Sequence, residues 1–147
     1  MVGGVLLLFA CGDATEQDDG ADAQCDLDVA VDEFATDTAM DCGAVDLEDP
    51  QAAWEAAQTC ALDGITNGMA IVLRWRPQTI DSIAAEAIVS DAGMHTWIAR
   101  DDYMGDVSLQ SYACSSISIQ EECTVAVGQM CLACAEGGDR VETCRSD

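Results

Sequence analysis

The chain has 147 residues, of which 28 are Asp or Glu and only five are basic, so its formal net charge is −23. So acidic a surface repels phosphate backbones, which proteins bind through Lys and Arg, and this argues against nucleic acid as a partner. Anionic lipid headgroups are repelled for the same reason, and the length suits one small core rather than two.

The N-terminal segment is apolar, and residues 2–10 carry no charge. This run is too short for a membrane-spanning helix, which needs about 20 residues, but it suits the apolar part of a secretory signal. Leu8, Ala10 and Cys11 resemble the end of a bacterial lipoprotein signal, although Phe9 is larger than that family prefers and no Lys or Arg precedes Arg74. The resemblance implies a signal peptide over 1–10, lipid on Cys11, and anchoring to a bacterial membrane, in the periplasm or at the cell surface.

Residues 12–24 contain no large apolar side chain. Such a segment cannot offset its ordering entropy by burial, so we expect a disordered acidic tether over 11–24 with a reach of about 20 Å. The remaining residues, 25–147, are expected to form a single domain.

Nine cysteines indicate where the chain resides. Setting Cys11 aside as the lipidated residue leaves an even set, which predicts four disulfides and an oxidising compartment. Zinc ligation usually adds His or repeated close pairs, but there is one CxxC and one His, so we expect neither a metal nor another cofactor. Sequence alone cannot choose the pairing among the eight: Cys25, Cys42, Cys60, Cys114, Cys123, Cys131, Cys134 and Cys144.

Residues 25–48 are predicted to be an irregular, disulfide-pinned lead-in to the domain. They are rich in Asp, but a calcium loop starting at Asp26 would need Asp or Asn and then Gly where Ala30 and Val31 stand. We therefore expect no calcium site here.

A helix is predicted over 50–63. Asp49 suits the N-cap, Pro50 the first helical position and Gly64 the C-terminal stop. Trp54, Ala57 and Ala61 form its apolar stripe.

The segments that follow are mostly β-type. Residues 69–76 alternate apolar with other side chains, and 94–103, 107–112, 117–119 and 124–127 also suggest strands. Residues 80–90 fit a strand or a helical stripe, and the turn sequence over 90–93 favours a strand. The order predicts an α+β domain in which one helix packs on a small antiparallel sheet of three to five strands, stapled by disulfides.

No catalytic motif is evident. A Ser or Cys nucleophile usually needs a base, and His95, the only His, lies in a predicted strand where it is more often a packed or surface residue. The Cys131–Cys134 CxxC could be a redox pair, but such chemistry is expected near a βαβ pattern.

We therefore expect a non-catalytic domain with a binding or structural role, a secreted enzyme or an inhibitor-like domain being the alternative. Five residues are of types common in binding hot spots and could contact a protein or a glycan: Arg74, Trp75, Arg76, Trp97 and Tyr103. The competing interpretation is that the two Trp fill the core and that the two Arg balance acidic neighbours.

Overall fold

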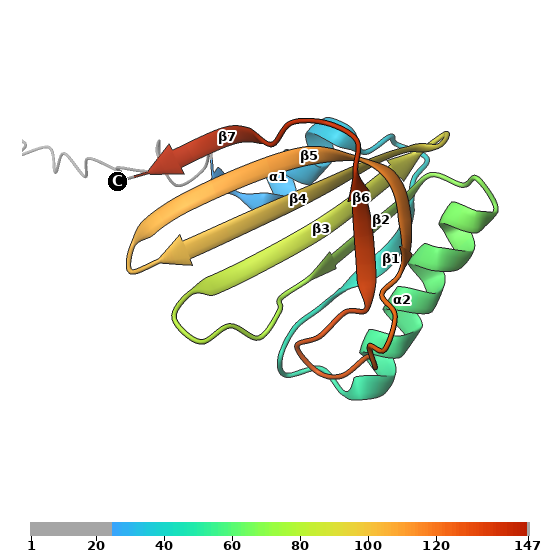
Figure 1. Cartoon of the computed structure of the whole chain (residues 1–147), viewed down its shortest axis with the longest axis horizontal. Coiled ribbons are helices and arrows are strands. Elements are labelled where there is room, and N and C mark those ends of the chain that lie inside the picture. Colours follow the sequence, from blue (N-terminus) through green and yellow to red (C-terminus); the bar gives the residue numbers. More distant parts are fainter. Residues whose placement is uncertain (1–24, 147) are drawn as a thin grey trace, which may run out of the picture.

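The computed structural model describes residues 25–146, so the predicted signal peptide, Cys11 and the tether lie outside the described residues (Figure 1). The described elements follow in this order: α1 (Leu27–Phe34), β1 (Met40–Val45), α2 (Gln51–Thr66), β2 (Ile71–Trp75), β3 (Ile83–Asp91), β4 (Met94–Tyr103), β5 (Asp106–Ile119), β6 (Leu132–Glu136) and β7 (Val141–Ser146).

The seven described strands form one mixed sheet in the order β1-β2-β3-β4-β5-β6, and β7 also pairs with β5. β1 and β2 are parallel and α2 connects them, whereas β2 to β5 form an antiparallel meander. The α+β class is confirmed. The predicted sheet of three to five antiparallel strands differs from the observed one in two ways. It has too few strands, because the lead-in contributes β1 and the Cys-rich tail contributes β6 and β7. It also lacks the parallel pair, which β1 forms with β2.

The lead-in over 25–48 is not irregular, because it contains α1 and β1. Asp26 caps α1: its side chain accepts hydrogen bonds from the backbone N–H groups of Asp28 and Val29. Ala30 and Val31 are buried against Val72, Ile98 and other apolar residues on one face of the sheet. Figure 1 shows α1 behind the sheet, away from α2.

Helix α2 covers the other face. Trp54, Ala57 and Ala61 are buried together with Leu73 and Trp75, which confirms the predicted apolar stripe. At the N-terminus Pro50 takes the cap position without a side-chain bond, and Asp49 instead accepts a hydrogen bond from the backbone N–H of Asp46 at 2.9 Å.

The predicted stop at Gly64 is wrong, because α2 continues to Thr66. Asn67 caps the helix, and Gly68 follows with φ +67°, a conformation that glycine adopts readily. Gly64 is buried in the helix interior, and a Cβ added there would collide with the side chain of Ile71. It therefore permits close packing of α2 on β2.

The turn predicted over 90–93 is confirmed, because β3 and β4 are joined at Ala92 and Gly93. β4 and β5 are joined at Met104 and Gly105, between the strands predicted over 94–103 and 107–112. All four residues have positive φ, as a type I′ turn requires.

Beyond the second hairpin the predictions are partly wrong. The two strands expected over 107–112 and 117–119 are one continuous strand, β5. The strand expected over 124–127 is absent, and in its place there is an isolated bridge between Ala126 and Gln129 at a turn containing Gly128.

All eight cysteines of the described region form disulfides. Cys25 pairs with Cys144, Cys42 with Cys60, Cys114 with Cys134 and Cys123 with Cys131. They tie the start of α1 to β7, β1 to α2, β5 to β6, and the 120–131 loop to itself. The two cysteines of the CxxC bind different partners, so they do not form a redox pair with each other. Four disulfides indicate an oxidising, extracellular location.

Over residues 25–146 we find no helix with both the length and the apolar character needed to cross a membrane.

Candidate functional site: a pocket on the α1 face of the sheet

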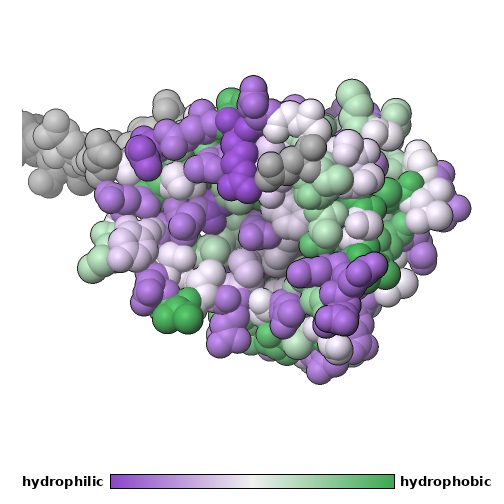
Figure 2. Space-filling model, viewed as in Figure 1, coloured by the Kyte–Doolittle hydropathy of each residue, from purple (hydrophilic) through white to green (hydrophobic). Residues whose placement is uncertain are grey.

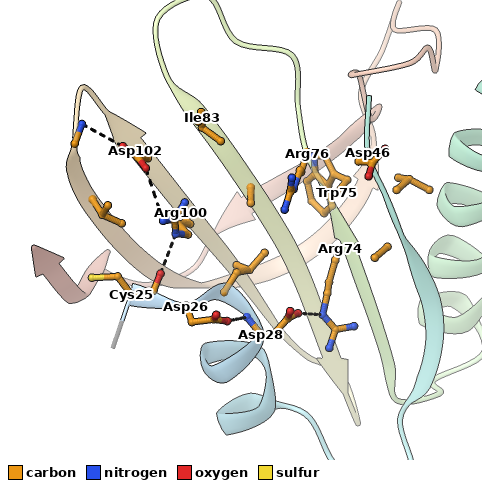
Figure 3. A pocket seen from close by; sticks show the side chains of 16 residues that line it. Cys25, Asp26, Asp28, Asp46, Arg74, Trp75, Arg76, Ile83, Arg100 and Asp102 are labelled. Carbon is orange, nitrogen blue, oxygen red and sulfur yellow. Dashed lines mark hydrogen bonds and ion pairs between the residues drawn. The ribbon is translucent and has the colours of Figure 1, made fainter. Parts of the chain in front are cut away.

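Helix α1 covers only part of its face of the sheet. Its buried residues lie over Val72, Val89 and Ile98. Where α1 begins, the same face opens into a hollow of about 710 Å³. Figure 3 shows the arginines and aspartates that line this hollow, which we call the α1-face pocket.

Four parts of the chain surround the α1-face pocket. The N-terminal end of α1 supplies Asp26 and Asp28, and the end of β1 supplies Asp46. The central strands and the β4–β5 hairpin supply Arg74, Arg76, Ile83, Ala85, Arg100, Asp102, Gly105 and Val107, and the lining is completed by Cys25, Leu27, Ala44, Val45 and Trp75. Strand alternation points Arg74 and Arg100 to this face while Trp75 and Ala99 point toward α2.

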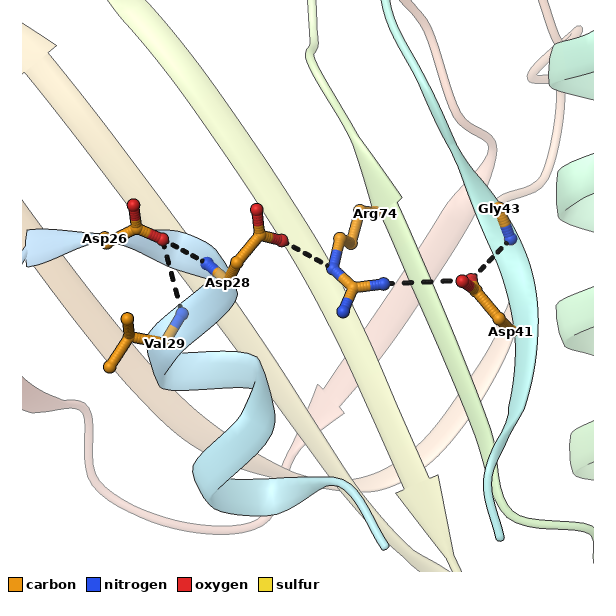
Figure 4. Close-up of polar contacts among 6 residues, drawn as sticks. All are labelled: Asp26, Asp28, Val29, Asp41, Gly43 and Arg74. Carbon is orange, nitrogen blue, oxygen red and sulfur yellow. Dashed lines mark hydrogen bonds and ion pairs between the residues drawn. The ribbon is translucent and has the colours of Figure 1, made fainter. Parts of the chain in front are cut away.

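Arg74 is held by two carboxylates. Its Nε lies 2.8 Å from Asp28 Oδ1 on α1, and its Nη1 lies 3.7 Å from Asp41 Oδ1 on β1 (Figure 4). The Arg74 side chain therefore bridges α1, β2 and β1, and its expected role of balancing acidic neighbours is confirmed.

Arg100 is also partly engaged. Its Nε donates a 2.9 Å hydrogen bond to the backbone oxygen of Cys25, and its Nη2 lies 3.9 Å from Asp102 Oδ2. The second distance is too long for a hydrogen bond, so the terminal nitrogens of Arg100 retain donor capacity toward the hollow.

Arg76 differs from both. Its backbone N–H donates to the oxygen of Val45, but its exposed guanidinium makes no ion pair or hydrogen bond with any described residue. Arg76, Asp46 and Ile83 also line a smaller neighbouring hollow of about 410 Å³, so Arg76 stands between the two.

The α1-face pocket is nearly balanced in charge. Three of the five arginines of the chain line it, and the acidic residues beside them are Asp26, Asp28, Asp46 and Asp102. In a chain of net charge −23, where acidic residues outnumber basic ones by 28 to five, this clustering of three arginines distinguishes the pocket from the rest of the acidic surface.

The two tryptophans pack on the other face of the sheet, although Trp75 also contributes to the lining of the pocket. Trp75 and Trp97 are buried on the α2 side with their ring centroids 5.2 Å apart, edge to face. Trp97 stacks on Tyr112, and Arg140 lies over the Tyr112 ring at 4.9 Å. The expectation that both Trp fill the core is confirmed, whereas Tyr103 is half-exposed at the end of β4.

A partly buried carboxyl group lies beside these rings. Burial raises the pKa of Glu86 from 4.5 to about 6, and a hydrogen bond from the Trp97 side chain partly opposes the rise. Glu86 pairs with Trp75 on β2 and with Ala99 on β4, so its side chain lies on the α2 face, outside the α1-face pocket.

Ser90 and His95 form a hydrogen bond across the β3–β4 hairpin, 2.8 Å between Oγ and Nδ1. Burial lowers the pKa of His95. The Ser90 side chain is almost fully buried, and neither residue lines either hollow. The pair therefore joins two strands and gives substrate no access to the hydroxyl.

Sequence reasoning identified Arg74 and Arg76 but missed Arg100, Asp102 and Ala85. The available signal was the alternation of the 94–103 segment, which places Arg100 and Asp102 on one face. Whether Arg100 and Asp102 lie on the same face of the sheet as Arg76 depends on the register between strands, which the sequence does not give.

Within residues 25–146 no group of three or more His, Cys, Asp or Glu side chains is arranged to hold a metal ion. Comparison of the chain with protein-family models, curated proteins and solved structures found no match.

Proposed function

We propose that this chain is an exported, non-catalytic binding domain and that its ligand occupies the α1-face pocket. The observation that carries the proposal is the convergence of Arg74, Arg76 and Arg100 on one open hollow of an otherwise strongly acidic molecule. The volume of about 710 Å³ falls in the range of small-molecule and cofactor sites.

The lining supports binding rather than catalysis. Its cysteine, Cys25, is bonded to Cys144. His95 does not line the pocket, so no imidazole can act there as the base that a nucleophile would need. What the lining offers is guanidinium donors, carboxylate acceptors and a few apolar contacts, which orient a ligand.

Hydrophobic docking has less support. The most exposed large apolar side chains include Ile80 and Met104, in the loop before β3 and in the β4–β5 turn. Figure 2 shows hydrophilic residues interrupting the hydrophobic ones over the face in view.

We propose export on the basis of the four disulfides, and lipid attachment at Cys11 on the resemblance to lipoprotein signals. The intact mass of the natural protein tests the attachment: a mature N-terminus at Cys11 carrying acyl chains is the expected result, and an unacylated Cys11 would contradict it.

A ligand titration tests the pocket. The probes are alanine, trialanine, acetate, glucose and N-acetylglucosamine, each added to the ¹⁵N-labelled domain. We expect at least one to cause saturable shifts in the backbone amides of Arg74, Ala85 and Arg100.

Two variants make the test specific. Ala85→Phe fills the floor of the pocket and should abolish those shifts, whereas Arg145→Ala removes an exposed arginine from β7 and should leave them unchanged. Shifts confined to another surface, or none with any probe, would overturn the assignment.

A further inference from the structure

We infer that the α1-face pocket binds a compact zwitterion, a small molecule that carries one carboxylate and one ammonium group. The two groups are separated by a few bonds in the smallest such ligand and by a few residues in the largest. A short peptide with free ends and a free amino acid share this chemistry. The inference rests on the proposed function and adds the class of ligand.

The carboxylate would bind between Arg76 and Arg100. Ala85 pairs with Arg100 on β4, and extending the β2–β3 register one residue beyond Trp75–Glu86 places Arg76 opposite Ala85. The two arginines thus flank a residue whose side chain is a single methyl group. Figure 3 shows Arg76 and Arg100 on opposite sides of strand β3. Paired N–H donors of a guanidinium match the geometry of a carboxylate.

Arg74 is unsuited to this role because Asp28 and Asp41 already surround its guanidinium. Arg76 has no such partner among the described residues, and Arg100 has committed one N–H, to the oxygen of Cys25. An incoming carboxylate would therefore displace no existing ion pair of Arg76.

The ammonium group would bind Asp46 or Asp102. Asp46 accepts a hydrogen bond from the N–H of Glu48 through Oδ1, and its Oδ2 has no donor among the described residues. Asp102 accepts from the N–H of Gly105 at 3.2 Å, and its Oδ2 lies 3.9 Å from Arg100. Both carboxylates therefore have an oxygen able to accept from a ligand.

Charge distribution favours a zwitterion over simpler ions. The field of a molecule with charge −23 repels a plain anion before it reaches the arginines, and a plain cation could pair with the aspartates but would leave Arg76 and Arg100 without an acceptor. A ligand of zero net charge avoids the first penalty and satisfies both kinds of side chain in the pocket.

The experiment compares trialanine with free ends, with an acetylated N-terminus, with an amidated C-terminus and with both ends blocked. Kd is measured by titration at low salt. We expect each block to weaken binding about tenfold or more, because each removes a charge-assisted hydrogen bond.

Variants assign the two ends. Arg76→Ala should weaken binding of the free peptide, and in that variant amidation should have much less effect. Asp46→Asn, Asp102→Asn or both should also weaken binding of the free peptide, and in the variant that does so acetylation of the N-terminus should have much less effect. Arg145→Ala is the control and should leave every Kd within twofold of the parent.

The outcomes separate this inference from the proposed function. Tighter binding of free alanine than of trialanine would support the zwitterion and set its size. Equal binding of blocked and free peptides, or pocket shifts with acetate or a sugar but not with a zwitterion, would overturn the inference and leave the pocket as the ligand site. If no probe shifts the pocket amides, both proposals fail.

Discussion

Arg74, Arg76 and Arg100 share one side-chain chemistry but have different surroundings. Arg74 joins three elements through Asp28 and Asp41, Arg100 secures the chain before α1 through the Cys25 oxygen, and Arg76 projects from the end of β2. The first two are therefore part of the structure of the pocket wall. Arg76 is the residue whose loss should weaken binding of the proposed ligand with least effect on the fold.

Glu86 provides a pH prediction at the same scale. Because its folded-state pKa is raised to about 6 from 4.5, the folded protein binds more protons than the unfolded chain between those values, and stability falls as pH rises through that window. Above pH 6 the ionised, partly buried carboxylate of Glu86 costs up to about 2 kcal/mol of folding stability. Glu86→Gln should therefore raise the free energy of unfolding by up to this amount at pH 7 and by very little at pH 4, as measured by urea denaturation at both pH values.

The control for that experiment is Glu121→Gln. It makes the same change in net charge at an exposed position of the 120–131 loop, which matters because removing any acid relieves repulsion in this chain. An equal gain from both variants at pH 7 would contradict a specific cost at Glu86.

At the scale of elements, the contact between α2 and β2 depends on Gly64. Alanine is favoured over glycine in a helix interior by about 1 kcal/mol, yet an added Cβ would meet the buried, β-branched Ile71 side chain. We therefore predict that Gly64→Ala destabilises the protein, by about 1–3 kcal/mol, as measured by denaturant unfolding.

A double-mutant cycle checks the cause. In an Ile71→Ala background the obstructing atoms are absent, so Gly64→Ala should cost little or become stabilising. If the cost of Gly64→Ala is the same in both backgrounds, Ile71 is not its source.

Helix α1 and strand β1 show why single elements were hard to predict. α1 has eight residues, of which Ala30 and Val31 are buried, and β1 contains Gly43 at an irregularity in its register with β2. Neither offers a long periodic pattern. Helix α1 packs on β2, β3 and β4, and β1 pairs with β2 and contacts α2, so both elements depend on parts of the chain that come later in the sequence.

At the scale of the whole molecule, the four disulfides close loops of very different length. Cys25–Cys144 spans 119 residues of sequence and Cys123–Cys131 spans 8. In the chain-entropy model the long loop contributes about 5 kcal/mol and the short one about 2.5 kcal/mol. Replacing both cysteines of the long-loop pair with Ala should therefore lower the unfolding free energy more than the same replacement of the short-loop pair.

Denaturant unfolding of the two double variants, under identical oxidising conditions, measures the difference. A larger loss from the Cys123–Cys131 pair would mean that local packing around the buried Cys131 outweighs loop length. Either loss would be a large share of the roughly 5–15 kcal/mol expected for a domain.

The sequence by itself determined the α+β class, the central helix with its Trp54 stripe, the hairpins at 92–93 and 104–105, and an even set of disulfide-forming cysteines. These follow from residue periodicity, turn chemistry and cysteine arithmetic, all of which act over a few neighbouring residues or over composition. Only the tertiary structure decided the disulfide pairing, the placement of β1, β6 and β7, and the presence of Arg76, Ala85 and Arg100 in the lining of one pocket. Those depend on strand register and on contacts between residues far apart in the chain, which local patterns do not specify.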